Sequence, residues 1–168
     1  MEAQSAAAAP RVGDDGGLDR ATVAEFVYEN MLVSRLAAQG VAPFRRDDAL
    51  DRSATLLLAR LEAQGPMTVA ELSAAFGLDV STVHRQVAAA MRAGLIERLA
   101  DPEGGQAKVH RPTAVGSARL ADELAARGTA ATQVLEGFSQ DELETYVRLM
   151  RRFNEGVERV REQPWPRP

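Results

Sequence analysis

Residues 67–98 contain two short helix signatures separated by a tight turn, and this pattern constrains the fold more than any other feature of the chain. Thr68 and Glu71 have the spacing of a capping box, which marks the start of a helix. Gly77 can end that helix because glycine accepts the left-handed conformation, and Asp79 is placed to cap a second helix. The stretch therefore predicts a helix-turn-helix followed by a strand.

The second of these helices, expected over residues 80–93, has one apolar and one polar side. Val80, Val83 and Val87 recur at three- and four-residue spacing, which predicts a buried face that anchors the helix. The other side carries hydroxyls, a histidine and arginines, groups that can bond base edges or phosphates in a major groove. The candidates for DNA contact on this helix are Ser81, Thr82, His84, Arg85 and Arg92. An ordinary solvated face is the alternative, which the pairing of two capped helices disfavours.

A β-hairpin is predicted directly after this helix. Residues 95–99 have the pattern of a strand, and 101–105 form a turn rich in Asp, Pro and Gly, after which the chain returns. We interpret residues 95–112 as a wing, with Gln106 and Lys108 placed to contact the DNA backbone or the minor groove. A hairpin that only covers the core is the alternative.

Residues 78–116 resemble the winged helix of the MarR family of bacterial transcription regulators. The resemblance lies in a recognition helix, an Ala-Gly-Leu turn at 93–95, a wing containing Asp-Pro, and a Thr-x-x-Gly helix start from Thr113 to Gly116. In length and helix order the similarity extends over about residues 18–162.

The resemblance implies an all-α fold with a small β-hairpin wing, built as a winged helix-turn-helix plus a helical dimerisation region. In MarR-like proteins the N- and C-terminal helices form the interface of a homodimer. Two-fold symmetry then places the recognition helices about one turn of double-stranded DNA apart, so the operator is expected to be pseudo-palindromic. The wing departs from the family, because the positions that usually carry Arg fall at Gly105 and Gln106.

Other helix starts are marked by their caps. Asp47 or Asp48 is placed to cap a helix that runs to about Gln64, where Gly-Pro follows. Ser139 and Glu142 form a second capping box ahead of the last long helix.

Long amphipathic helices near both ends of the chain independently favour pairing of two copies. The alternative is that both helices cover the core of their own protomer. We divide the chain into a disordered tail (1–17), a helical dimerisation region (18–46 and 117–162), a winged helix-turn-helix DNA-binding domain (47–116) and a tail (163–168). Trp165 in the last segment is interpreted as a packing residue rather than a ligand group.

The formal net charge of −4 is unfavourable for DNA binding, because contacts with phosphates need local positive charge. Residues 79–111 hold five Lys or Arg and four Asp or Glu, a net of +1, so modest and salt-dependent affinity is expected. This mild charge supports the main alternative, a winged-helix protein-interaction module with weak or no DNA binding.

Other function classes are disfavoured by what the sequence lacks. The absence of cysteine excludes disulfides and thiolate metal sites. A metal site from His84, His110, Asp101 and Glu103 has no recognisable ligand spacing, and neither histidine has the partners of a catalytic triad. No Gly-rich phosphate loop opens a helix, so we expect neither an enzyme nor a cofactor. No apolar run is long enough for a membrane span, which favours the cytoplasm.

MarR-like regulators often respond to small aromatic or phenolic ligands held between the dimer helices and the DNA-binding lobe. The resemblance implies a repressor that such a ligand releases from DNA. The matching region of this chain includes Tyr28, Met31 and Phe44, which are equally candidates for ordinary core positions.

Overall fold

The structure is a computed structural model that describes residues 17–39, 49–100 and 107–167, without the side chains of 36–39. Several expectations lie outside the described residues: residues 1–16 of the expected disordered tail, the Asp47 or Asp48 cap, Phe44, Gln106 and the turn of the wing.

The chain divides into two units, residues 1–41 and 42–168. The described part of the first unit contains the helix α1 (Arg20–Gln39). Its first turn is capped by Asp19, whose carboxylate accepts a hydrogen bond from the Thr22 backbone nitrogen at 2.9 Å. Apolar side chains of α1, including Val27 and Met31, are exposed.

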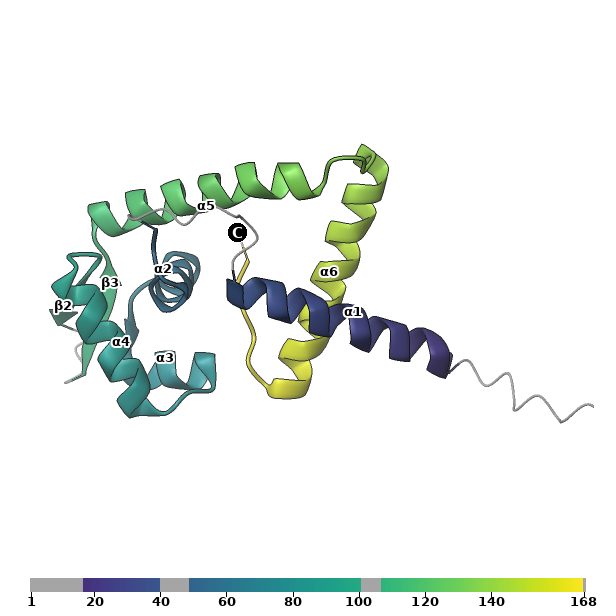
Figure 1. Cartoon of the computed structure of the whole chain (residues 1–168). Coiled ribbons are helices and arrows are strands. Elements are labelled where there is room, and N and C mark those ends of the chain that lie inside the picture. Colours follow the sequence, from purple (N-terminus) through teal and green to yellow (C-terminus); the bar gives the residue numbers. More distant parts are fainter. Residues whose placement is uncertain (1–16, 40–48, 101–106, 168) are drawn as a thin grey trace, which may run out of the picture. The chain divides into compact units, whose positions relative to one another are not determined.

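The second unit contains five helices and three short strands among its described residues (Figure 1). In chain order they are α2 (Arg52–Gln64), β1 (Met67–Thr68), α3 (Val69–Phe76), α4 (Val80–Arg92), β2 (Ile96–Ala100), β3 (Lys108–Pro112), α5 (Ala114–Val134) and α6 (Gln140–Arg161). This confirms a mostly helical fold with a winged helix-turn-helix. None of the helices in the described part of the chain is long and apolar enough to cross a membrane.

The core of the second unit lies between α2 and the helix-turn-helix. Leu57, Leu58 and Leu61 on α2 are at most 1% exposed, as their helical spacing predicts. They belong to one cluster with residues from other elements of the winged helix, namely Met67, Leu72, Val83, Val87, Ala90, Leu95 and Ile96.

The two expected capping boxes are confirmed, and the cap of α2 requires a correction. Both capping boxes are formed, at Thr68 for α3 and at Ser139 for α6. However, α2 begins at Arg52 and its cap is Asp51, whose side chain accepts from the Ala54 backbone nitrogen at 2.8 Å. The chain before Asp51 does not join the helix, since Leu50 donates its backbone N–H to buried Glu123 on α5.

The sheet has three strands in the order β1–β3–β2, with both pairs antiparallel. The hairpin of β2 and β3 agrees with the sequence analysis, which missed β1. β1 has only two residues, Met67 and Thr68, which pair with His110 and Val109. The sequence did not reveal β1 because a strand of two residues has no alternation of apolar and polar side chains to detect. It forms because β3 of the wing supplies a partner for its backbone.

The end of α4 is tied to the start of α5 by backbone geometry. Gly94 is left-handed (φ +69°), and Leu95 donates its N–H to the Ala90 carbonyl at 3.0 Å, which completes a Schellman motif. Thr113, the cap of α5, donates its N–H to the Leu95 carbonyl at 3.0 Å and its hydroxyl to the Gly94 carbonyl at 2.7 Å. A Cβ at Gly116 would collide with the Leu95 carbonyl oxygen, so only glycine fits there.

We therefore expect Gly116→Ala to lower the free energy of unfolding by about 1–3 kcal/mol or more, because the carbonyl it meets is fixed backbone. Gly128→Ala is the matched control, because nothing lies within 4 Å of a Cβ placed at that position of the same helix. This control should gain roughly 0.5–1 kcal/mol from improved helix propensity. Urea unfolding of both variants measures the difference, and equal stability would contradict the packing described for Gly116.

Candidate nucleic-acid interface

The helix α4 is held by its buried side. Val83, Val87 and Ala90 are at most 4% exposed and follow one helical stripe into the core. Val80, which the sequence analysis also assigned to this anchor, is 55% exposed. Val80 is exposed because it is the first residue of α4 and lies ahead of the part of the helix that the core covers. The residues that anchor α4 are therefore Val83, Val87 and Ala90.

The turn before α4 fixes where the helix begins. Gly77 ends α3 in the left-handed conformation (φ +61°), and the Ser73 hydroxyl donates to the Leu78 carbonyl. Asp79 precedes the helix as expected, but its side chain makes no capping hydrogen bond. Its carbonyl accepts instead from the backbone nitrogens of Thr82 and Val83 at 2.9 and 3.1 Å.

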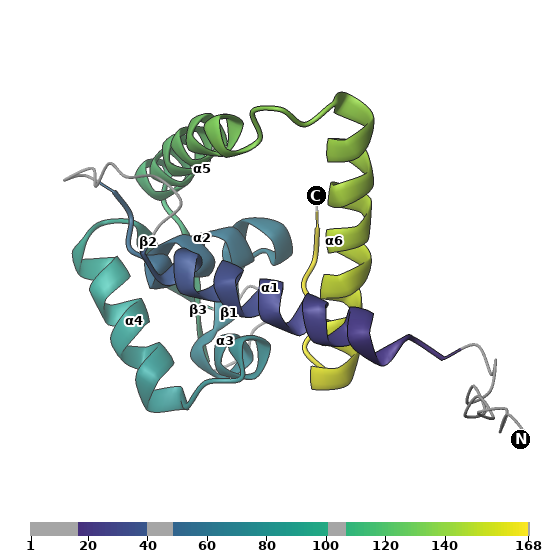
Figure 2. The same cartoon turned by 45° about the vertical axis from the view of Figure 1, so that its right-hand side comes forward.

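The side of α4 opposite the anchor carries the polar residues that the sequence analysis selected. Ser81, His84 and Arg85 are exposed and Thr82 is half-buried; we call these four residues the polar face of α4. Arg85 donates to the Thr82 hydroxyl at 3.2 Å, which links two of them. Figures 1 and 2 show α4 at the periphery of the second unit, and the exposure of Ser81, His84 and Arg85 leaves this face open to a partner.

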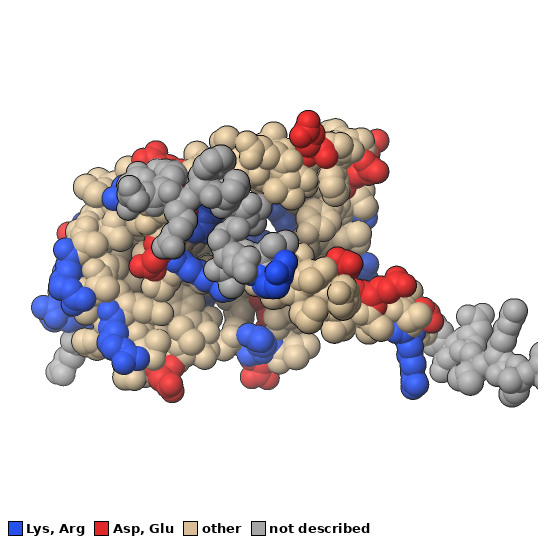
Figure 3. All heavy atoms as spheres, in the orientation of Figure 1, with Lys and Arg blue, Asp and Glu red and all other residues tan. Residues whose placement is uncertain are grey.

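Further cations flank the polar face. Arg92 in the last turn of α4 and Lys108 at the start of β3 are exposed, as is Arg98 on β2, which the sequence analysis did not select. Arg111 differs because it forms an ion pair at 2.8 Å with Glu97, directly across the strand pair. Lys and Arg atoms gather over α4 and the strands in Figure 3. This clustering gives the surface more local positive charge than the net charge of the chain suggests.

His110 has a structural position rather than a ligand position. It is 4% exposed within β3, and its Nδ1 atom has no hydrogen-bond partner. Burial lowers the pKa of His110, as do the nearby Arg98 and His84, whereas a hydrogen bond with the Met67 backbone opposes the shift. Among the described residues no three His, Asp or Glu side chains gather as a metal site requires; Asp101 and Glu103 lie outside them.

The candidate ligand residues fall on the first unit or outside the described residues. Tyr28 and Met31 are exposed on α1, in the first unit, and Phe44 is not described. The grouping of these three residues at a ligand site therefore stays a prediction.

The chain is similar to known transcription regulators in sequence and in fold. A sequence model of the MarR family matches residues 48–107. An uncharacterised HTH-type transcriptional regulator from Bacillus subtilis, YxaD, is 36% identical over 110 residues, which cover 66% of this chain and 77% of that protein.

Solved structures show the same fold at lower identity. A MarR family protein from Bacillus stearothermophilus has a TM-score of 0.66 at 23% identity, and the match covers 84% of this chain and 99% of that one. Bordetella bronchiseptica BpsR, whose DNA binding is regulated by 6-hydroxynicotinic acid, has a TM-score of 0.57 at 18% identity, covering 76% and 98% of the two chains.

The buried histidine gives a test of this arrangement. Folding lowers the pKa of His110 by burial, whereas the unfolded chain takes up a proton near the ordinary pKa of about 6.5. The unfolded state thus binds more protons at low pH, and the free energy of unfolding should fall from pH 7 to pH 5. In His110→Gln this part of the pH dependence should disappear, while His84→Gln, on the exposed polar face, should keep most of it, because burial is the largest cause of the shift. Urea titrations at several pH values measure the slope, and an unchanged slope in His110→Gln would refute the assignment.

Proposed function

Because the chain belongs to the MarR family of transcriptional regulators, we propose that it is a homodimeric repressor that binds pseudo-palindromic double-stranded DNA. The family consists of regulators rather than enzymes. In this proposal residues 47–116 bind DNA, and residues 18–46 and 117–162 hold two copies together.

The observation that carries the proposal is the two-sided character of α4. Its buried stripe fixes the helix in the core, so the polar face is presented in one orientation. Ser81, Thr82, His84 and Arg85 are suited to base edges, and Arg85 can hold guanine with two parallel hydrogen bonds. The flanking residues are suited to contacts with the phosphates or the minor groove of the DNA; they are Arg92, Arg98, Gln106 and Lys108.

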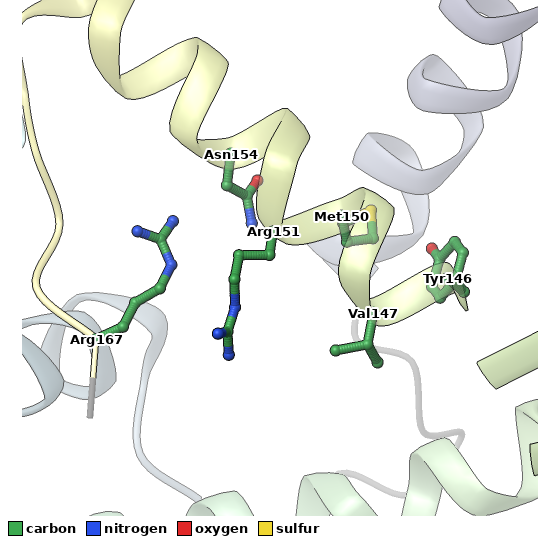
Figure 4. Close-up of a pocket in the computed structure, with 6 residues that line it drawn as sticks. All are labelled: Tyr146, Val147, Met150, Arg151, Asn154 and Arg167. Carbon is green, nitrogen blue, oxygen red and sulfur yellow. The ribbon is translucent and has the colours of Figure 1, made fainter. Parts of the chain in front are cut away.

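An exposed apolar stripe on α6 supports the homodimer. No residue of α6 is buried, although Tyr146, Val147, Met150, Phe153 and Val157 follow helical spacing and are 36–51% exposed. A continuous apolar stripe of this length on a surface helix is typical of an interface. A hollow lies beside the same helix, between α6 and the end of the chain (Figure 4). It is lined by Tyr146, Val147, Met150, Arg151, Asn154 and Arg167.

Release by a small aromatic ligand completes the proposal. The ligand must bind the DNA-incompetent arrangement of the dimer more tightly than the competent one, since only differential affinity shifts an equilibrium. Regulation of BpsR by 6-hydroxynicotinic acid is a precedent within the same fold. Tyr28, Met31 and Phe44 remain the candidate contacts.

Arg85→Ala should weaken binding to the specific operator by about 1–3 kcal/mol, because a bidentate base contact is lost. Arg52→Ala is the charge-matched control, because Arg52 is exposed at the start of α2 rather than on the polar face. Fluorescence anisotropy with a duplex selected from random DNA measures both affinities. Wild-type affinity in Arg85→Ala would remove this residue from base recognition. If the wild type binds no duplex at all, the protein-interaction alternative is favoured.

Val147→Glu should dissociate the dimer, because a carboxylate would be buried in an apolar interface. We expect a loss of roughly 2 kcal/mol or more, about 30-fold in the dissociation constant. Thr145→Glu adds the same charge on the opposite side of α6 and should leave the dimer intact. Sedimentation velocity separates the two species. A monomeric wild type, or a dimer unaffected by Val147→Glu, would argue against an interface on α6.

A further inference from the structure

We propose that the last residues of the chain are a positioning element, which holds α6 against the helix-turn-helix and so sets the separation of the two recognition helices in the dimer. The inference rests on the proposed function and concerns residues 163–167, which we call the C-terminal strap. From the sequence this segment was expected to be a tail in which Trp165 packs, and the packing is confirmed. Its backbone continues from α6 and passes between that helix and α2 in both views (Figures 1 and 2).

One side of the strap is bound to α2 and α3. Arg60 on α2 is 5% exposed and donates from Nη1 to the Pro164 carbonyl at 2.7 Å. The same guanidinium lies 5.0 Å from the ring centroid of Trp165, within the range of a cation–π interaction. The Trp165 ring also packs on Phe76, the last residue of α3, with centroids 6.0 Å apart and planes inclined by 37°.

The other side of the strap is bound to α6 through Glu158. The Glu158 carboxylate accepts from the Trp165 backbone nitrogen at 3.2 Å, and from both terminal nitrogens of Arg167. The hydrogen bond from Arg167 lowers the pKa of Glu158, so the pair is charged at neutral pH. The chain can turn back here because Glu162 ends α6 in the left-handed conformation (φ 55°).

The strap also reaches the turn that leads into α4. The side chain of Gln163 lies so close to Gly77 that a Cβ there would overlap it. Gly77 ends α3, and α4 begins three residues later at Val80. Pro164 and Pro166 restrict the backbone of the strap, which makes it a stiff connection rather than a loose one.

A second connection changes what α6 can do. The covalent connection of α6 to the rest of its unit is the turn after α5, where Gly137 has a positive φ of 96°. The strap adds a non-covalent connection at the other end of the helix. A helix held at one end can swing, whereas one held at both ends cannot. Since α6 carries the proposed dimer face and α4 the DNA face, the angle between them determines how far apart two copies of α4 lie. The strap therefore restricts the dimer to one half-site spacing.

Trp165→Ala removes the ring that both Arg60 and Phe76 contact, and Trp165→Phe keeps an aromatic ring as the matched control. Because the natural chain has no cysteine, one spin label at Ala89→Cys, an exposed position on α4, reports a single distance across the dimer. We expect a narrow distance distribution in the wild type and in Trp165→Phe, and a broad one in Trp165→Ala. Equal widths in all three proteins would overturn the proposal.

The second measurement uses duplexes whose two half-sites are separated by one base pair more or fewer. The wild type and Trp165→Phe should prefer one spacing, and Trp165→Ala should lose that preference while it still binds as a dimer. Weaker binding with the preference retained would indicate a merely stabilising role and overturn the proposal. If the wild type is a dimer but binds none of the duplexes, the proposed function fails. The distance distributions, which need no DNA, then still decide the role of the strap, so the two failures are distinguished.

Discussion

The burial of one stripe of α4 is the constraint on which the rest of the structure depends. Val83, Val87 and Ala90 enter the core that the leucines of α2 build, so the rotation of α4 about its axis is fixed. The polar face is then presented outward, with the hydrogen bond from Arg85 to the Thr82 hydroxyl within it. A surface that must meet the edges of bases needs this rigidity, because a disordered helix would have to be ordered at the cost of binding energy.

The wing and α5 are joined to that core by side chains, including Ile96 and Leu120, and also by backbone hydrogen bonds. The Leu95 carbonyl, just after α4, accepts the N–H of Thr113, and Gly116 allows α5 to pass directly against it. The orientation of α5 is therefore set within a few residues of α4. At the other end of α6 the strap returns to Phe76, beside the turn before α4. Both ends of α4 are thus close to elements that lead to the proposed dimer face.

The parts that the sequence predicted are those with local signals. Capping boxes at Thr68 and Ser139 depend only on residues three apart, so they could be found without knowing the fold. The exposure of Val80, the cap at Asp51 and the pairing of β1 all depend on what lies nearby in three dimensions. The strap was missed for the same reason, because Arg60 lies 104 residues before the Pro164 carbonyl that it binds. The DNA-contact assignment remains a prediction from the polar face.

Hydroxyl-radical footprinting of the full-length wild type on a selected operator tests the central claim most directly. Two copies of α4 held by one rigid dimer should protect two half-sites about one helical turn apart, near 34 Å, on the same face of the duplex. A single protected half-site, protection spread without sequence preference, or no protection would contradict the account.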